Sequence, residues 1–216
     1  DSIATEGYRI ESSGGSTALV NLSEIDFEAL QAKFAQVHKR TEAEKLRRLI
    51  EGRLAQMVAL NSSRVELAEK FQKLIDEYNA GSRNIEMFFE ELKDFAKALT
   101  TEEQRAVAEA LTEEELALFD ILTKPEPTLT KAEQAEVKKV CRDLLATLKR
   151  EKLVLDWREK QQARMAVMQT LKMSMLPTKL PAAYSKDIRA EKLARAYAHV
   201  YDHYYGESAS AYAARV

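Results

Sequence analysis

One stretch shows the pattern that decides the fold class: Leu111-Thr112-Glu113-Glu114-Glu115-Leu116-Ala117-Leu118-Phe119-Asp120-Ile121-Leu122. The Thr112 hydroxyl can accept a hydrogen bond from a free backbone N–H in the first turn of a helix. Glu115, three residues later, can reach back to the N–H of Thr112. Acidic side chains in this turn are also favoured by the positive end of the helix dipole. The stretch therefore predicts that a helix starts at Thr112.

The same pairing, a hydroxyl residue followed three positions later by an acid or amide, recurs along the chain. The five further pairs are Ser23/Asp26, Thr41/Glu44, Ser63/Glu66, Thr101/Gln104 and Thr130/Glu133. Apolar residues at steps of three and four agree with them, for example in the series Ile85, Phe88, Phe89, Leu92, Phe95, Ala96 and Leu99. The six pairs together predict at least six helix starts.

The composition also favours helices, because only 6 Gly and 4 Pro occur among the 216 residues. Turn signals near residues 79–81, 125–127 and 177–181 separate the helical segments, and two late helices are expected over residues 156–175 and 185–205. No fixed-period repeat is visible. We therefore expect an all-α fold, a bundle of roughly eight to nine helices, with a short irregular or hairpin-like N-terminal arm.

Features that mark secretion or membrane insertion are missing from the sequence. The single cysteine, Cys141, excludes an internal disulfide framework and fits a reducing compartment. No apolar run approaches the roughly 18 uncharged residues that a membrane span requires. The first eleven residues are polar and acidic, unlike a signal peptide. We therefore expect a cytoplasmic protein with no membrane partner.

Charge is distributed unevenly, although the net charge is only −2. Residues 83–120 carry 4 basic and 11 acidic residues, whereas residues 131–172 carry 11 basic and 6 acidic ones. Positive density of this kind can contact phosphates without reading sequence. The candidates for DNA or phosphate contact are Lys138, Lys139, Arg142, Lys149, Arg150 and Arg158. The alternative is a solvated face with interspersed acids.

Several short motifs resemble catalytic or metal sites, but their context does not fit. Asp76-Glu77-Tyr78-Asn79 resembles the Mg²⁺-holding box of helicase motors, yet it ends an amphipathic helix and no Gly-Lys phosphate loop accompanies it. Glu136-Val137-Lys138 resembles the end of a nuclease motif but falls in mid-helix, where the required strand is missing. The sequence therefore predicts no catalytic residue and no bound cofactor in this chain.

Two further features have both a structural and a functional interpretation. His199 and His203 lie four residues apart, a spacing that can hold Zn²⁺, but two ligands do not make a site. We expect no metal there, and instead a cation at a helix C-terminus and packing beside tyrosines. Trp157, the sole Trp, is a candidate anchor at a partner interface, although a core position is the alternative.

Five separated segments occur in order along the chain. They are Asn-Ser-Ser-Arg-Val-Glu-Leu-Ala-Glu-Lys-Phe-Gln-Lys-Leu-Ile-Asp-Glu-Tyr-Asn-Ala-Gly-Ser at 61–82, Phe-Phe-Glu-Glu-Leu at 88–92, the stretch 111–122 quoted above, Lys-Leu-Val-Leu-Asp-Trp-Arg-Glu-Lys-Gln-Gln at 152–162, and His-Val-Tyr-Asp at 199–202. Together these segments resemble the C-terminal helical domain of the motor (restriction) subunit of type I restriction-modification enzymes. The resemblance covers roughly residues 61–206, about two-thirds of the chain.

The resemblance implies a division of the chain. Residues 1–22 are then an arm or linker from upstream motor domains, and residues 23–60 are connector helices. Residues 61–206 are the C-terminal helical domain, and residues 207–216 are a tail that frays.

The resemblance also implies a role in assembly. The parent subunit is an ATP-dependent type I site-specific deoxyribonuclease and translocase, with ATP and Mg²⁺ bound upstream of this region. In that family the C-terminal region is associated with holding the motor on the methyltransferase and specificity subunits, with DNA passing nearby. We therefore expect a non-catalytic tether, monomeric in isolation, for which DNA is a second partner. The alternative is a stand-alone helical adaptor or a non-specific DNA-binding module.

Overall fold

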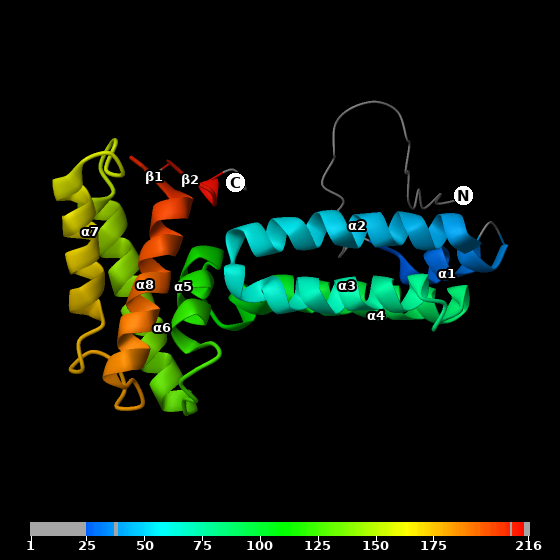
Figure 1. Cartoon of the computed structure of the whole chain (residues 1–216), viewed down its shortest axis with the longest axis horizontal. Coiled ribbons are helices and arrows are strands. Elements are labelled where there is room, and N and C mark those ends of the chain that lie inside the picture. Colours follow the sequence, from blue (N-terminus) through cyan, green and yellow to red (C-terminus); the bar gives the residue numbers. More distant parts are fainter. Residues whose placement is uncertain (1–24, 37–38, 208, 214–216) are drawn as a thin grey trace, which may run out of the picture. The chain divides into compact units, whose positions relative to one another are not determined.

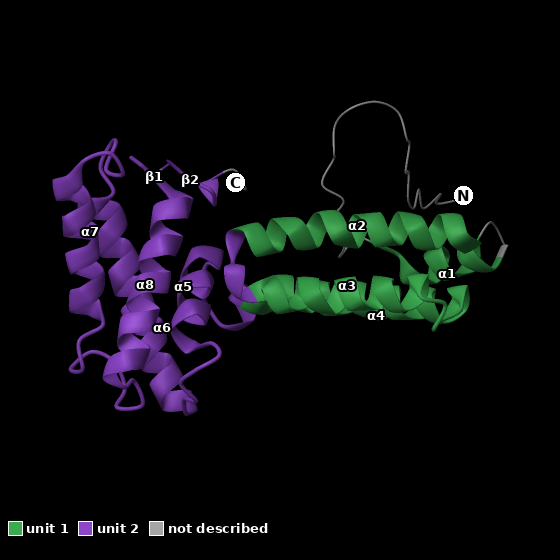
Figure 2. Cartoon of the chain, viewed as in Figure 1, with its two compact units in different colours: residues 1–59, 64–105 green, residues 60–63, 106–216 purple. Residues whose placement is uncertain are grey.

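The computed structural model describes residues 25–36, 39–207 and 209–213. These residues form two compact units, one from the described residues up to 59 together with 64–105, and the other from residues 60–63 together with the described residues from 106 onward (Figure 2). Of the described residues 75% are helical, in eight α-helices with short 3-10 and π-helical turns, and one very small two-stranded sheet accompanies them. The prediction of an all-α bundle is confirmed. The predicted arm over residues 1–22 lies outside the described residues, and the division at residue 61 stays a prediction.

The first unit consists of four helices that share one apolar core (Figure 1). They are α1 (Phe27–Gln36), α2 (Lys39–Leu60), α3 (Val65–Asn79) and most of α4 (Ile85–Ala108). Most of the stripe predicted on α4 is buried in this core, and its members Ile85 and Phe95 are partly buried against it. The stripe of α2 that contains Leu46, Ile50, Leu54 and Met57 is buried in the same core. Stacked aromatic rings join the helices, with the Phe34 and Phe89 centroids 3.8 Å apart.

Helix starts in the first unit differ from the predicted pairs. The Asp26 carboxylate itself accepts bonds from the first turn of α1, at 3.0 Å from the N–H of Glu28, while Ser23 lies outside the described residues. The α2 helix begins at Lys39, so Thr41 is already helical. Glu44 binds Arg47 and Arg48 instead of a backbone N–H.

The pair predicted at Ser63 does not form a capping box, although α3 begins two residues later, and the start predicted at Thr101 is wrong. Ser63 donates its hydroxyl proton to Asn61 Oδ1 at 2.7 Å, and no side chain caps α3. Thr101 lies inside α4, where its hydroxyl bonds the carbonyl of Lys97 at 3.1 Å. The α4 helix continues through this position because extending a helix costs less than nucleating a new one. Its true cap is Asn84, whose Oδ1 accepts from the Met87 N–H at 2.8 Å.

The second unit contains α5 (Glu113–Thr123), α6 (Lys131–Thr147), α7 (Gln161–Ser174) and α8 (Lys186–His203). One π-helical turn, Leu148–Lys152, extends α6. The pairs at Thr112 and Thr130 are confirmed as complete capping boxes, with both reciprocal hydrogen bonds present. The Ser185 hydroxyl caps α8 by accepting from the Ile188 N–H.

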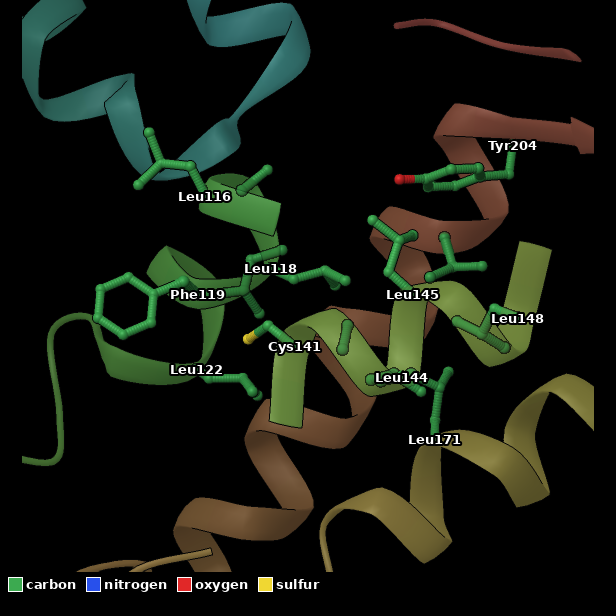
Figure 3. Packing of buried hydrophobic residues seen from close by; sticks show 14 of the residues in the cluster. Leu116, Leu118, Phe119, Leu122, Cys141, Leu144, Leu145, Leu148, Leu171 and Tyr204 are labelled. Carbon is green, nitrogen blue, oxygen red and sulfur yellow. The ribbon is translucent and has the colours of Figure 1, made fainter. Parts of the chain in front are cut away.

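The α5 helix forms the centre of this unit. Seven consecutive residues, 116–122, are buried, which requires neighbours on every side of the helix. The α6 and α8 helices pack against it. Figure 3 shows Leu118 and Leu122 of α5 on the same side as Cys141 and Leu144 of α6, in the buried cluster to which Phe119 also belongs.

A buried carboxylate on α5 ties residues 60–63 into the second unit. Asp120 accepts a hydrogen bond from the Asn61 amide at 2.8 Å, and the Ser63 hydroxyl oxygen lies 3.1 Å from the same carboxylate oxygen. The Lys124 ammonium lies 3.3 Å from its other oxygen. A buried charge is tolerated only when it is paired and hydrogen-bonded in this way.

Within the tail predicted to fray, the structure describes residues 207 and 209–213, while residues 208 and 214–216 lie outside the described residues. The β1 strand (Tyr204–Gly206) pairs in antiparallel fashion with β2 (Ala209–Ser210). The buried Tyr212 hydroxyl donates to the carbonyl of Leu60 at 2.6 Å, so residues 209–212 close the core of the second unit. Among the described helices, none has the length and apolar character that crossing a bilayer requires.

Candidate docking surface

The uneven charge of the sequence is largely neutralised within the second unit. Three of the six predicted phosphate-contact residues pair with acids just before or at the start of α5. Lys138 Nζ lies 2.5 Å from Glu109, Lys149 Nζ lies 3.0 Å from Glu114, and Arg142 Nε lies 4.0 Å from Glu115. Three basic residues of segment 131–172 therefore pair with three acidic residues of segment 83–120.

The other three candidates have different surroundings. Lys139 is exposed on α6, and Arg150 binds the carboxylate of its neighbour Glu151. The Arg158 guanidinium lies over the ring of Tyr205, 4.8 Å from the centroid. The structure thus places the six residues on α6, on the π turn and on the turn that follows it. Because four of the six pair with glutamates, less positive charge is unpaired there than the sequence suggested. Their contact with DNA stays a prediction.

Trp157 is not the partner anchor that the sequence allowed. Its side chain is 0% exposed, and its indole N–H donates to the carbonyl of Tyr204 at 2.9 Å. The predicted helix over residues 156–175 begins only at Gln161, so Trp157 lies in a turn rather than on a helix. A buried ring with a satisfied N–H stabilises the fold and offers no surface to a partner.

His199 is also buried, which contradicts its predicted role as a cation at a helix end. Burial lowers the pKa of His199 from 6.5 to about 3, and the neighbouring His203 ring contributes to the same shift. Tyr212 gives its only proton to Leu60, so the His199 Nε2, 3.0 Å from the Tyr212 hydroxyl, must carry a proton and donate it. His199 is therefore a neutral hydrogen-bond donor that holds the C-terminal residues.

Motifs that resembled catalytic sites lie where the sequence interpretation put them. Asp76 to Asn79 form the last turn of α3, where Glu77 binds Arg83. Val137 is buried on α6 between the two charged residues of its motif. Burial raises the pKa of the Cys141 thiol, which makes it a poor nucleophile. Within the described ranges no three His, Cys, Asp or Glu side chains are grouped as a metal site would require.

Four large apolar side chains remain exposed where the turn after α6 meets the end of α8. They are Val154 (47% exposed), Leu155 (52%), Tyr201 (37%) and Tyr205 (44%), and we call them the apolar patch. Arg158 lies beside both tyrosines, with its guanidinium 5.7 Å from the Tyr201 centroid. Tyrosine and arginine are the residue types that contribute most to protein interfaces.

The backbone beneath the apolar patch is held firmly in place. The Glu207 N–H donates to the carbonyl of Leu153 at 3.0 Å. At Gly206 the chains approach so closely that an added Cβ would lie 2.5 Å from the Val154 carbonyl oxygen. The buried Trp157 ring supports Tyr201 edge to face, with centroids 5.8 Å apart. The apolar patch therefore presents its side chains from a preorganised base.

A shallow hollow of about 380 Å³ adjoins the apolar patch at Val154. Lys152, Lys160 and Glu151 contribute polar groups to its lining, and Ala163 and Ala166 contribute small apolar surfaces. An apolar centre with a polar border is the usual composition of a protein interface. The sequence alone did not indicate this patch, because only the folded C-terminal residues bring Tyr201 and Tyr205 beside Val154 and Leu155.

Comparison with known proteins identifies the family. Residues 10–198 match the family described as type I restriction enzyme HindI endonuclease subunit-like, C-terminal. Searches of curated proteins and of solved structures gave no match. The matched range spans most of the 216 residues and includes all eight described helices except the last turns of α8. The chain therefore belongs to the family of C-terminal domains of type I restriction enzyme HindI endonuclease subunit-like proteins.

Proposed function

We propose that this chain is a non-catalytic docking domain that holds its parent endonuclease subunit on the methyltransferase and specificity subunits. Catalysis, with ATP and Mg²⁺, then belongs to domains upstream in the parent subunit. The family assignment supports the restriction-enzyme context. The docking role rests on the exposed side chains described above.

The apolar patch is the observation that carries the proposal. Four neighbouring large apolar side chains cost solvation free energy in an isolated chain, and such exposed clusters commonly mark interaction sites. Because their backbone is already fixed, binding would order little of it, which favours affinity. The Arg158 guanidinium between the tyrosines adds a directional donor to an otherwise apolar contact.

The patch also determines how the proposal should be tested. Truncating the parent subunit near Asn61 would leave α2 without α3 and α4 and would expose Leu46, Ile50 and Leu54 of the first unit. Loss of assembly after such a truncation would then have a trivial explanation. Substitution of exposed residues leaves the core intact and avoids this ambiguity.

We expect the double substitution Leu155→Asp and Tyr205→Ser in the parent subunit to prevent assembly. The subunit should still hydrolyse ATP, yet elute separately from the methyltransferase and specificity subunits on size-exclusion chromatography. Charge in the centre of an interface and loss of a tyrosine anchor each weaken binding by about 2 kcal/mol or more.

The matched control is Met165→Asp with Met173→Ser. Both methionines lie on α7, and they are as exposed as the patch residues but lie outside the patch. This control should assemble normally. Normal assembly of the patch variant would refute the docking role of this surface, as would equal loss in both variants.

A further inference from the structure

A second surface, in the first unit, has a composition that the docking role does not explain. A hollow of about 690 Å³ opens between the first turns of α2, the end of α3 and the start of α4. This volume lies in the range of pockets that bind ligands. All its lining residues belong to the first unit, so the hollow is independent of the apolar patch.

The floor of the hollow is apolar and partly aromatic. Phe88 and Tyr78 are stacked with centroids 4.1 Å apart and rings 9° from parallel. Phe88 is buried, whereas Tyr78 and Ile85 are only partly covered. Ala43 of α2 contributes a small side chain that leaves the space open. Such a floor favours an aliphatic or aromatic side chain of a ligand.

Cations of α2 form the border of the hollow. Arg40, Lys45 and Arg48 line it with a single acid, Glu44. Bonds from Arg47 and Arg48 lower the pKa of Glu44 to about 2, so its charge is permanent but already compensated. Glu42 compensates Lys45 at 2.7 Å. The Arg48 side chain is 73% exposed, so its guanidinium can bind a ligand while it stays paired with Glu44.

The spacing of the two arginines indicates the shape of the ligand. Arg40 and Arg48 are eight residues apart on α2, which places them about 12 Å apart along the helix. A mononucleotide concentrates its negative charge in one cluster and would satisfy only one of them. A helix with carboxylates two turns apart and apolar residues between them would meet both arginines and the floor.

We propose that this hollow binds an acidic amphipathic helix of a partner protein. The apolar face of that helix lies on Tyr78, Ile85 and Phe88, and its carboxylates bind Arg40 and Arg48. The positive end of the α2 dipole, beside Arg40, adds to the attraction for acidic side chains.

The test uses the whole chain and a fluorescein-labelled synthetic helical peptide, with Glu residues eight positions apart and Leu and Phe between them. Fluorescence anisotropy should show saturable binding of the peptide. The double substitution Arg40→Glu and Arg48→Glu should weaken binding at least ~10-fold, because two attractive contacts become repulsive. A peptide of the same composition with its Glu and apolar residues scrambled should bind more weakly.

The matched control reverses two exposed lysines of α3 that lie outside the hollow, Lys70→Glu and Lys73→Glu, with the same change in net charge. This variant should keep its affinity within about twofold. Circular dichroism of both variants should match the unsubstituted chain. Two outcomes would overturn the proposal: no binding of the peptide, or equal loss of affinity in the control variant. If the peptide does not bind, a duplex oligonucleotide that binds through Arg40 and Arg48 would assign the hollow to nucleic acid instead.

Discussion

Replacing Trp157 by alanine is expected to lower the free energy of unfolding of the second unit by about 4 kcal/mol. The indole is fully buried, and its removal leaves a cavity among the surrounding side chains. The Tyr204 carbonyl also loses the donor that lies 2.9 Å away. Urea denaturation followed by circular dichroism measures the change.

The substitution Trp157→Phe separates the cost of the cavity from the cost of the lost hydrogen bond to Tyr204. It keeps an aromatic ring in the core but removes the N–H, so we expect a smaller loss of about 2 kcal/mol. A Trp157→Ala variant within about 1 kcal/mol of the unsubstituted chain would contradict the core role of Trp157. It would reopen the interpretation of this residue as a surface anchor.

Acid is expected to destabilise the second unit through His199. The folded state holds His199 neutral, with a pKa lowered from 6.5 to about 3, whereas the unfolded chain takes up a proton below pH 6.5. The free energy of unfolding therefore keeps its full value above pH 6.5. Below pH 6.5 it falls by about 1.4 kcal/mol per pH unit. Between pH 6.5 and 5 the loss should reach about 2 kcal/mol.

Urea denaturation monitored by fluorescence can measure this loss, since Trp157 is the sole Trp and lies in the same unit. Measurement above pH 5 isolates the contribution of His199. The glutamates with lowered pKa values, such as Glu44 and Glu133, take up protons only in stronger acid. His199→Gln keeps a donor toward Tyr212 but cannot titrate. We expect it to flatten the pH dependence between 6.5 and 5, and an unchanged slope would exclude His199 as its source.

The sequence predicted the fold class well because helix patterns are local. The capping boxes at Thr112 and Thr130 need only three residues of context, and both form. The pair at Thr101 fails because Thr101 lies inside α4, which continues to Ala108 and buries Leu99 before it and Ala106 after it. Local chemistry therefore identifies possible helix starts, and packing decides which of them are used.

The surface was harder to predict, because it depends on contacts between distant residues. Lys138 and Lys149 belong to a basic segment in the sequence, but the packing of α6 on α5 gives each an acidic partner. Near the C-terminus, the Tyr212 hydroxyl binds the carbonyl of Leu60, which lies 152 residues earlier in the chain. No periodicity reveals such pairings before the chain folds.

The central claim, that the apolar patch is the docking site, is tested most directly by binding of this chain to the assembled methyltransferase–specificity complex. Isothermal titration calorimetry should show saturable binding of the unsubstituted chain and of the Met165→Asp, Met173→Ser control. The Leu155→Asp, Tyr205→Ser variant, folded by circular dichroism, should bind at least ~100-fold more weakly. If the unsubstituted chain does not bind, or the patch variant binds equally well, the docking account is contradicted.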